Sequence, residues 1–182
     1  MNRIFIAAAL PEAVRSRIHS EVAISLSKVF SDHSVRIIAK DSLHLTLKFL
    51  GETAEAKIPG IANAVAAAAR AANASALLRT GQIQLFTPFV VAIGIDDLTG
   101  SVSAVQADLD ERLESLGFQR EARRFRPHVT IGRSRGRQRV TRRVIFERIP
   151  EFEFSVESLV LMRSDLGSVG AKYSPLSEFR LA

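Results

Sequence analysis

The sequence predicts an α+β domain made of two similar lobes, and two observations lead to this prediction. The 182 residues are the length of one domain that buries a substantial core. The chain passes twice through strand, long helix and further strands, and each pass contains one strand with the step His-x-Thr. We therefore expect residues 1–182 to form a single domain of two pseudo-symmetric lobes.

The first pass opens with a strand over 3–10, RIFIAAAL. A basic residue ahead of a short apolar run also suits a signal peptide, but Pro11 and Glu12 stop this run early. We therefore favour a buried strand. Pro11 suits the first turn of a helix, whose apolar positions would be Val14, Ile18, Val22 and Leu26.

The first lobe continues with strands over 35–39 and 43–51, the second of which is closed by Gly51. The alanine-rich stretch from Ala54 to Asn73 has strong helix propensity and predicts the next helix.

The second pass contains an amphipathic helix over 97–116, which Gly117 would end. The segment 137–149 is short and ambiguous, and we expect a helical turn or a loop there. The strands expected in this pass are 76–86, 89–95, 124–133, 152–166 and 172–181.

The composition excludes several classes of protein. Apolar residues make up 47% of the chain and charged residues 24%, and no apolar run approaches the roughly 18 residues of a membrane span. The chain has no cysteine, which excludes disulfides and thiolate metal sites. We expect a cytoplasmic protein that does not bind a membrane, and a monomer.

The net charge of +6 is unevenly distributed, because eleven arginines lie between Arg120 and Arg148. The planar fork of arginine suits bidentate contacts with phosphate, which favours a phosphate-bearing partner. The alternative is a solvated basic face without a specific partner.

The two His-x-Thr strands contain the candidate catalytic residues. Alternate side chains of a strand share a face, so His44, Thr46 and Lys48 should point one way, and Arg126, His128 and Thr130 likewise. The opposite faces would be formed by Leu43, Leu45, Leu47 and Phe49 in the first strand and by Phe125, Val129 and Ile131 in the second. Such strands hold a titratable ring rigidly, as a catalytic site requires.

Two imidazoles that face each other can act as a base and an acid, because the pKa of histidine lies near neutrality. This pair suits phosphodiester hydrolysis, with Thr46 and Thr130 donating hydrogen bonds to phosphate oxygens and Lys48 adding positive charge. The alternative is that both are core histidines beside β-favouring threonines; duplication of the motif argues against it. His19 and His33 are expected to be ordinary surface residues.

Other catalytic chemistries lack their residues. The four histidines are scattered without an H-E-x-x-H motif, so a zinc site is not expected. There is no glycine-rich phosphate loop.

The motifs HLTL and HVTI resemble the two H-x-[ST]-x signatures of the 2H phosphoesterase superfamily. Their flanks narrow the resemblance to the bacterial and archaeal RNA 2′,3′-cyclic phosphodiesterases, also called 2′-5′ RNA ligases. The landmarks span nearly the whole chain, and in order they are RIFIAAALPEAVRSRI, LHLTLKFLGE, FRPHVTIGR and FSVESLVLMRSDLGSVGAKYSPLSEFRL.

The resemblance implies a bilobal fold, with lobes of antiparallel sheet, helices packed outside, a central cleft, and neither metal nor other cofactor. It implies hydrolysis of an RNA 2′,3′-cyclic phosphate, for example on tRNA fragments, to a 2′-phosphomonoester. His44 would donate a proton to the 3′-oxygen, His128 would activate water, and Thr46 and Thr130 would hold the phosphate. Joining of RNA ends by the reverse reaction would use the same pair.

Arg133 matches an arginine commonly found five residues after the second histidine of this family. Regular alternation would place Arg133 on the face opposite His128. Either the strand ends or bulges at Gly132, or Arg133 contacts something other than the scissile phosphate. Arg126 and Lys48 complete the expected substrate-binding residues.

The chain departs from its relatives at TPFVVAIGI, where they often carry a Pro-Arg-Val-x-Trp strand. Phe86, Phe89 or Tyr173 could instead offer a stacking surface for a base, although each also suits a core position. Two alternative functions stay open: hydrolysis of small cyclic nucleotides or 2′-5′ oligonucleotides, and non-catalytic RNA binding.

Overall fold

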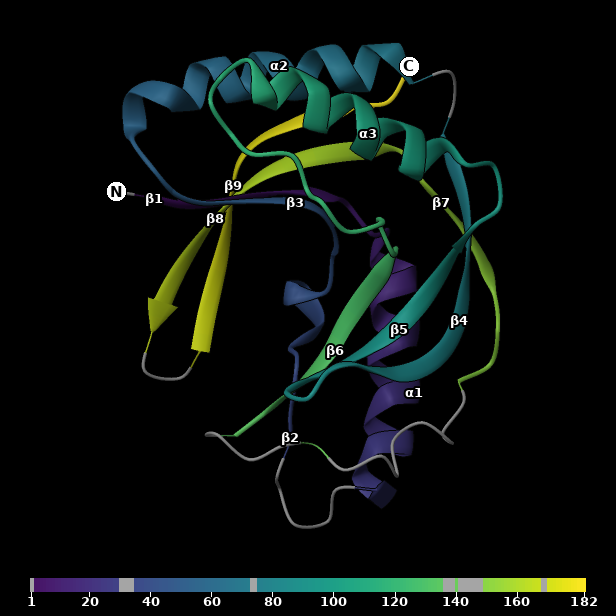
Figure 1. The fold of residues 1–182 in the computed structure, drawn as a ribbon. Helices are drawn as coiled ribbons and strands as arrows, with labels where there is room; N and C mark the ends of the chain where they lie inside the picture. The colour runs from purple at the N-terminus through teal and green to yellow at the C-terminus, as the bar shows by residue number, and fades with distance from the viewer. Residues whose placement is uncertain (1, 30–34, 73–74, 136–139, 141–148, 168–169) are drawn as a thin grey trace.

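The computed structural model describes residues 2–29, 35–72, 75–135, 140, 149–167 and 170–182 (Figure 1). The strands are β1 (Asn2–Ala8), β2 (Val35–Ile37), β3 (Leu45–Thr53), β4 (Ala76–Thr87), β5 (Val90–Asp97), β6 (His128–Ser134), β7 (Glu153–Val156), β8 (Ser158–Gly167) and β9 (Gly170–Arg180). The helices are α1 (Glu12–Val29), α2 (Ile58–Ala71) and α3 (Ser101–Glu114), and short 3-10 turns span Lys40–Ser42 and Glu55–Lys57. Most of the segment 137–149 lies outside the described residues.

The strands form one antiparallel sheet in the order β7-β4-β5-β6-β3-β1-β8-β9, and β2 pairs with β6 beyond the end of β3. The sheet has two parts, which we call the β3 half (β3, β1, β8 and β9) and the β6 half (β6, β5, β4, β7 and β2). A pairing of Leu45 with Val129 joins them. The predicted α+β class with antiparallel strands is confirmed.

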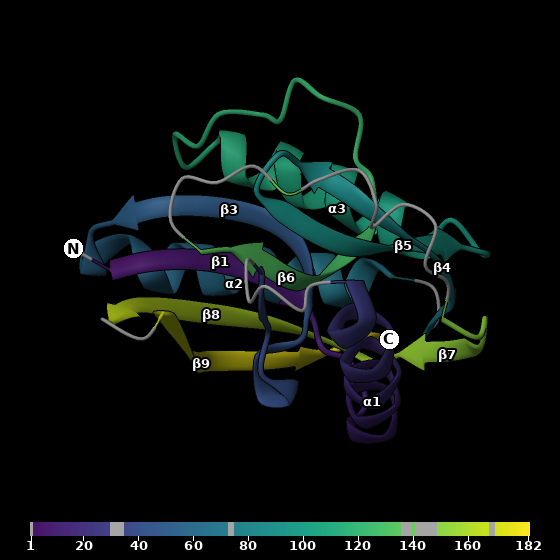
Figure 2. The same cartoon turned by 90° about the horizontal axis from the view of Figure 1, so that it is seen from below.

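The helices cover the outside of the sheet. Helix α2 packs on β8 and β9 of the β3 half, α3 lies beside α2 and packs on β3, β4 and β5, and α1 runs behind β4, β5 and β6 (Figures 1 and 2). The four predicted apolar positions of α1 are all buried, with Ile18 fully so. Helix α3 ends as expected near Gly117, which has a φ of 83° and lies within the turn that the Phe118 amide closes by donating to the Leu113 carbonyl.

Helices α2 and α3 are both shorter than the sequence predicts. The second helix begins at Ile58, because Pro59 is compatible only with a first turn. The third begins at Ser101, directly after Gly100, whose φ of 73° is left-handed.

The stretch 152–166 was expected to form one strand, and this prediction is wrong. It forms β7, which pairs with β4, and β8, which pairs with β1 and β9. Burial also changes at this point: in β7 only the alternate residues Phe154 and Val156 are buried, whereas all four residues from Ser158 to Leu161 are buried at the start of β8. The chain therefore crosses between the two halves at Glu157.

Candidate active site

The two histidines meet where the halves of the sheet join. His44 directly precedes β3, and His128 is the first residue of β6. Leu45 and Val129, which pair across the junction, are both fully buried and anchor the strands from below. Because side chains alternate along a strand, the neighbours of this apolar pair point to the other face.

The antiparallel register at this junction places each histidine opposite a threonine. Extending the pairing by one position in each direction puts His44 across from Thr130 and Thr46 across from His128. The four motif residues thus form a compact square from two strands that are 84 positions apart in sequence. The positive charge on either ring also disfavours charge on the other, since His128 contributes to lowering the pKa of His44.

Both imidazoles are oriented by the same kind of hydrogen bond, from Nδ1 to the backbone carbonyl two residues earlier. His44 Nδ1 lies 2.8 Å from the carbonyl oxygen of Ser42, and His128 Nδ1 lies 2.8 Å from that of Arg126. A carbonyl only accepts hydrogen bonds, so Nδ1 carries the proton in each ring. The neutral rings therefore present Nε2 as a free acceptor, the form that a general base requires.

Aromatic rings fix the planes of the imidazoles. His44 packs against Phe5 at 4.8 Å and against the edge of Tyr173 at 5.0 Å between ring centroids. His128 stacks on Phe86 at 3.7 Å with 21° between the planes. Of the three residues proposed to stack on a base, Phe86 and Tyr173 thus support the histidines, whereas Phe89 is 42% exposed.

Small residues flank both threonines, a feature that sequence reasoning missed. Ala7 pairs with Thr46, and Ala92 pairs with Thr130. Both alanines are nearly or fully buried and add only a methyl group beside each hydroxyl. The two half-buried hydroxyls therefore have room for phosphate oxygens. The alanines stand in the stretches AAAL and VVAIG, where nothing marks them apart from other buried strand residues.

A β-bulge brings Arg133 to the face of the site. Gly132 pairs with Val91 and Thr130 pairs with Ala92, so Ile131 is an extra residue that turns inward and is fully buried. The alternation is thereby shifted, and Arg133 lies near both imidazoles, since its charge contributes to lowering the pKa of each. Of the alternatives that the sequence left open for Arg133, the bulge is the correct one.

Gly132 is required by the close packing of β2 against β6. A Cβ at this position would lie 2.7 Å from Cγ1 of Val35, well inside van der Waals contact. The glycine therefore allows β2 to pack directly against β6.

A matching bulge in β3 takes Lys48 out of the site. Lys48 pairs with Ile6 and Thr46 pairs with Ala7, so Leu47 is the extra residue. Lys48 turns to the opposite face, where it is 8% exposed. The prediction that Lys48 shares a face with His44 and binds substrate is wrong.

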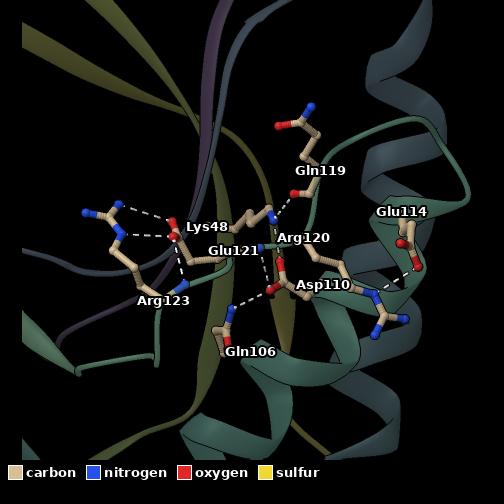
Figure 3. A network of polar contacts seen from close by, with 8 residues as sticks. All are labelled: Lys48, Gln106, Asp110, Glu114, Gln119, Arg120, Glu121 and Arg123. Carbon is tan, nitrogen blue, oxygen red and sulfur yellow. Dashed lines mark hydrogen bonds and ion pairs between the residues drawn. The ribbon is translucent and has the colours of Figure 1, made fainter.

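Lys48 instead belongs to a buried polar network beneath α3 (Figure 3). Its ammonium forms an ion pair with Asp110 and donates to the carbonyl oxygen of Gln119 at 2.5 Å. Asp110 also accepts hydrogen bonds from Gln106 Nε2 at 3.1 Å and from the Glu121 amide at 3.2 Å. The network ties β3 to the segment that leads from α3 to the second histidine.

Phe49 takes the place that Lys48 was expected to occupy. It is 60% exposed and lies 5.5 Å from the ring of Phe5, which itself contacts His44. The expectation that Phe49 points away from His44 is therefore wrong, for the same reason. Phe49 and Arg133 each stand five residues after a motif histidine, one in each half.

Arg126 lies at the edge of the site, as its spacing from His128 predicts. Its Nη2 donates to Gln84 Oε1 at 3.0 Å, and its guanidinium lies 5.4 Å from the centroid of Phe86. Its charge contributes to lowering the pKa of His128.

Burial and positive charge lower the pKa of both histidines. Desolvation is the main cause for His44, whose pKa falls to about 4, with further contributions from Arg133 and His128. The pKa of His128 is lowered by burial and then by Arg126 and Arg133. Both rings are therefore neutral at pH 7 in the free protein, and a phosphate anion beside them would favour the charged form.

The low pKa of His44 predicts a pH-dependent stability. Protonation favours the unfolded chain, where the pKa is 6.5 rather than about 4. The stability that neutral His44 contributes to the fold is therefore fully present above pH 6.5. As the pH falls toward 4, the free energy of unfolding decreases by at most about 1.4 kcal/mol per pH unit. Urea denaturation at about pH 5 and about pH 7.5 tests this. We expect His44→Asn to reduce the difference between the two pH values, and an unchanged difference would contradict the account.

A pocket of about 750 Å³ opens beside this square of residues, between the two halves of the sheet. Its lining includes Arg3 of β1, Arg36 of β2, Phe49, Arg133, Ser164 and Tyr173. The described part of the chain brings no three potential metal-ligating His, Asp or Glu side chains together. Within the described ranges, no helix has the length and apolar character needed to cross a membrane.

Comparison with known proteins decides the family. The sequence profile of the 2′-5′ RNA ligase superfamily matches residues 11–168. The chain belongs to this superfamily. The resemblance to this superfamily that the two His-x-Thr motifs predicted is thereby confirmed.

Similar members of the superfamily cover nearly the whole chain. A protein of Methanothermobacter thermautotrophicus, named RNA 2′,3′-cyclic phosphodiesterase, is 30% identical over 98% of this chain and 98% of its own. One of the same name from Methanocaldococcus jannaschii is 26% identical over 97% of this chain and 99% of its own. The names of these relatives agree with the predicted enzyme class.

Solved structures agree on the fold. The crystal structure of TT0787 of Thermus thermophilus superposes with a TM-score of 0.73 at 29% identity, over 98% of this chain and 97% of that one. That of E. coli LigT complexed with NADP+ has a TM-score of 0.76 at 26% identity, over 100% and 98% of the chains.

Proposed function

We propose that this superfamily member is an RNA 2′,3′-cyclic phosphodiesterase that hydrolyses the terminal cyclic phosphate to a 2′-phosphomonoester without a metal. One observation carries the proposal: the pairing of Leu45 with Val129 brings two His–Thr pairs onto one face, with Nε2 of both rings available. The names of the relatives in the two archaea support it, as does the structure of E. coli LigT complexed with phosphate, which is 25% identical.

The reaction needs one proton removed and one proton supplied. Nε2 of His128 takes a proton from water as its oxygen forms a bond to phosphorus. The bond between phosphorus and the 3′-oxygen breaks, and His44 gives its Nε2 proton to that oxygen. The product carries a 2′-phosphate and a free 3′-hydroxyl. The assignment of donor and acceptor to the two histidines follows the family resemblance.

His44 must be protonated before it can act as the acid, although its pKa in the free protein is about 4. Substrate binding raises this pKa, because the negative phosphate offsets the charge of Arg133 and favours the imidazolium form of His44. Protonation of His44 would thus be coupled to substrate binding. The same acid–base pair would also serve the joining of 2′,3′-cyclic and 5′-hydroxyl RNA ends, in which the 5′-hydroxyl takes the place of water, gives its proton to His128 and bonds to phosphorus while the 3′-oxygen leaves.

Thr46 and Thr130 would donate hydrogen bonds to the non-bridging oxygens as negative charge gathers there. Thr46→Val and Thr130→Val keep the shape of each side chain and remove the hydroxyl. We expect each to lower kcat by about 10²-fold, the loss typical of one such donor. Steady-state kinetics with an RNA 2′,3′-cyclic phosphate tests this, with Thr99→Val, an exposed residue before α3, as the control. A loss below about threefold in both motif variants would contradict the proposed role.

One experiment separates an enzyme from an RNA-binding module. Purified protein is incubated in EDTA with an RNA that ends in a 2′,3′-cyclic phosphate, and with a 2′,3′-cyclic mononucleotide. We expect turnover of the RNA despite the chelator. Binding of the RNA without turnover would contradict the proposal, and turnover of the mononucleotide alone would point to a small cyclic nucleotide as substrate.

A further inference from the structure

The pocket beside the catalytic residues has more positive charge than one scissile phosphate requires. Three arginines from three different strands line it, namely Arg3, Arg36 and Arg133. Arg133 acts on both imidazoles and so belongs to the reaction site. The reaction at the histidines does not explain Arg3, which comes from a different strand.

Arg3 faces the same side of the sheet as the histidines. In β1, Ile4 and Ile6 turn into the hydrophobic core, so Arg3, Phe5 and Ala7 share the opposite face. Phe5 packs on His44, and Ala7 pairs with Thr46. Arg3 lies four residues before Ala7, about 13 Å along the strand. This is roughly the span of one nucleotide plus an arginine side chain.

The Arg3 guanidinium is available for a ligand. The residue is exposed, and among the residues that the structure describes its guanidinium makes neither a hydrogen bond nor an ion pair. Its partner across the sheet is Glu52, yet the two side chains form no ion pair.

Arg36 and Arg133 add to the positive potential of the pocket. They are direct partners in the pairing of β2 with β6, and both line the pocket.

Two aromatic residues also line the pocket. Phe49, which is 60% exposed, and Tyr173 both border the pocket. Ring surfaces of this kind suit a nucleoside, whose bases and sugar pack on aromatic side chains. The volume of about 750 Å³ lies in the range of small-molecule sites.

We propose that this pocket binds the 5′-phosphate of the substrate's terminal nucleotide, with Arg3 as its principal ligand. The inference rests on the proposed function, which places the cyclic phosphate of that nucleotide at the histidines. In RNA the 5′-phosphate is the link to the preceding nucleotide, so the subsite selects oligoribonucleotides and 5′-phosphorylated nucleotides over nucleoside 2′,3′-cyclic phosphates.

Two matched substrates test the subsite: adenosine 2′,3′-cyclic phosphate with and without a 5′-phosphate. For the wild type we expect kcat/KM to be at least about tenfold higher with the 5′-phosphate, the effect of one charge-assisted hydrogen bond. Arg3→Gln should reduce this preference to about twofold or less. Arg70→Gln, which removes the same charge from the exposed end of α2, should leave it intact.

A binding measurement keeps the two proposals separate. Calorimetry compares adenosine 3′,5′-bisphosphate with adenosine 3′-monophosphate, and it needs no turnover. Tighter binding of the bisphosphate, lost in Arg3→Gln, supports the subsite even if no substrate is hydrolysed, and only the proposed function then fails. Equal affinity for both ligands, or a preference that Arg3→Gln retains, overturns the subsite.

Discussion

Replacing either His44 or His128 with asparagine is expected to lower kcat for hydrolysis of an RNA 2′,3′-cyclic phosphate by about 10²- to 10⁴-fold. Asparagine Nδ2 can still donate to the carbonyl of Ser42 or Arg126, which Nδ1 now contacts at 2.8 Å. It has no counterpart of Nε2, so proton transfer is lost while the fold is kept. Single-turnover kinetics measures the effect directly.

The double variant should be little slower than the slower single variant, because residues that act as a unit are not additive. His19→Asn in α1 is the matched control and should retain wild-type kcat. Circular dichroism verifies that each variant is folded. Full activity in either motif variant would exclude that histidine from the reaction.

Replacing Lys48 with methionine should cost about 3–5 kcal/mol in the free energy of unfolding. The change leaves the Asp110 carboxylate buried without its cation, and the carbonyl of Gln119 loses its donor (Figure 3). The remaining hydrogen bonds from Gln106 and the Glu121 amide are neutral and compensate only in part. Urea denaturation at pH 7 measures the loss as a lower midpoint.

Two further variants show that the loss arises from an unpaired charge. Lys48→Met combined with Asp110→Leu removes both charges, and we expect it to recover most of the stability. Lys172→Met, at an exposed position of β9, should change stability by at most about 0.5 kcal/mol. If the single variant at Lys48 were as stable as the wild type, the ion pair would contribute nothing.

The sequence was informative where local patterns decide structure. Alternation of apolar residues predicts the two motif strands, and helical spacing predicts the buried face of α1. The four residues of the two motifs come together because one buried pair, Leu45 with Val129, fixes the register between distant strands. Regular alternation is enough to place the histidine and threonine of each motif on one face.

The sequence was misleading where one extra residue changes the face of a strand. No pattern in the sequence distinguishes the bulges at Leu47 and Ile131 from regular strand, because pairing with the neighbouring strand decides which residue is extra. The same irregularity brings Arg133 into the site and takes Lys48 out of it. The aromatic supports of the imidazoles come from strands far away in sequence and could not be foreseen either.

The position of the phosphate in the product tests most directly whether these two histidines form one acid–base site. RNA with a 2′,3′-cyclic phosphate end is hydrolysed in EDTA, and ³¹P NMR distinguishes the two phosphomonoesters. If His44 protonates the 3′-oxygen while His128 activates water, the wild type yields only the 2′-phosphomonoester, and His44→Asn and His128→Asn yield almost none. A 3′-phosphomonoester, a mixture of the two, or equal yields from the variants would contradict the account.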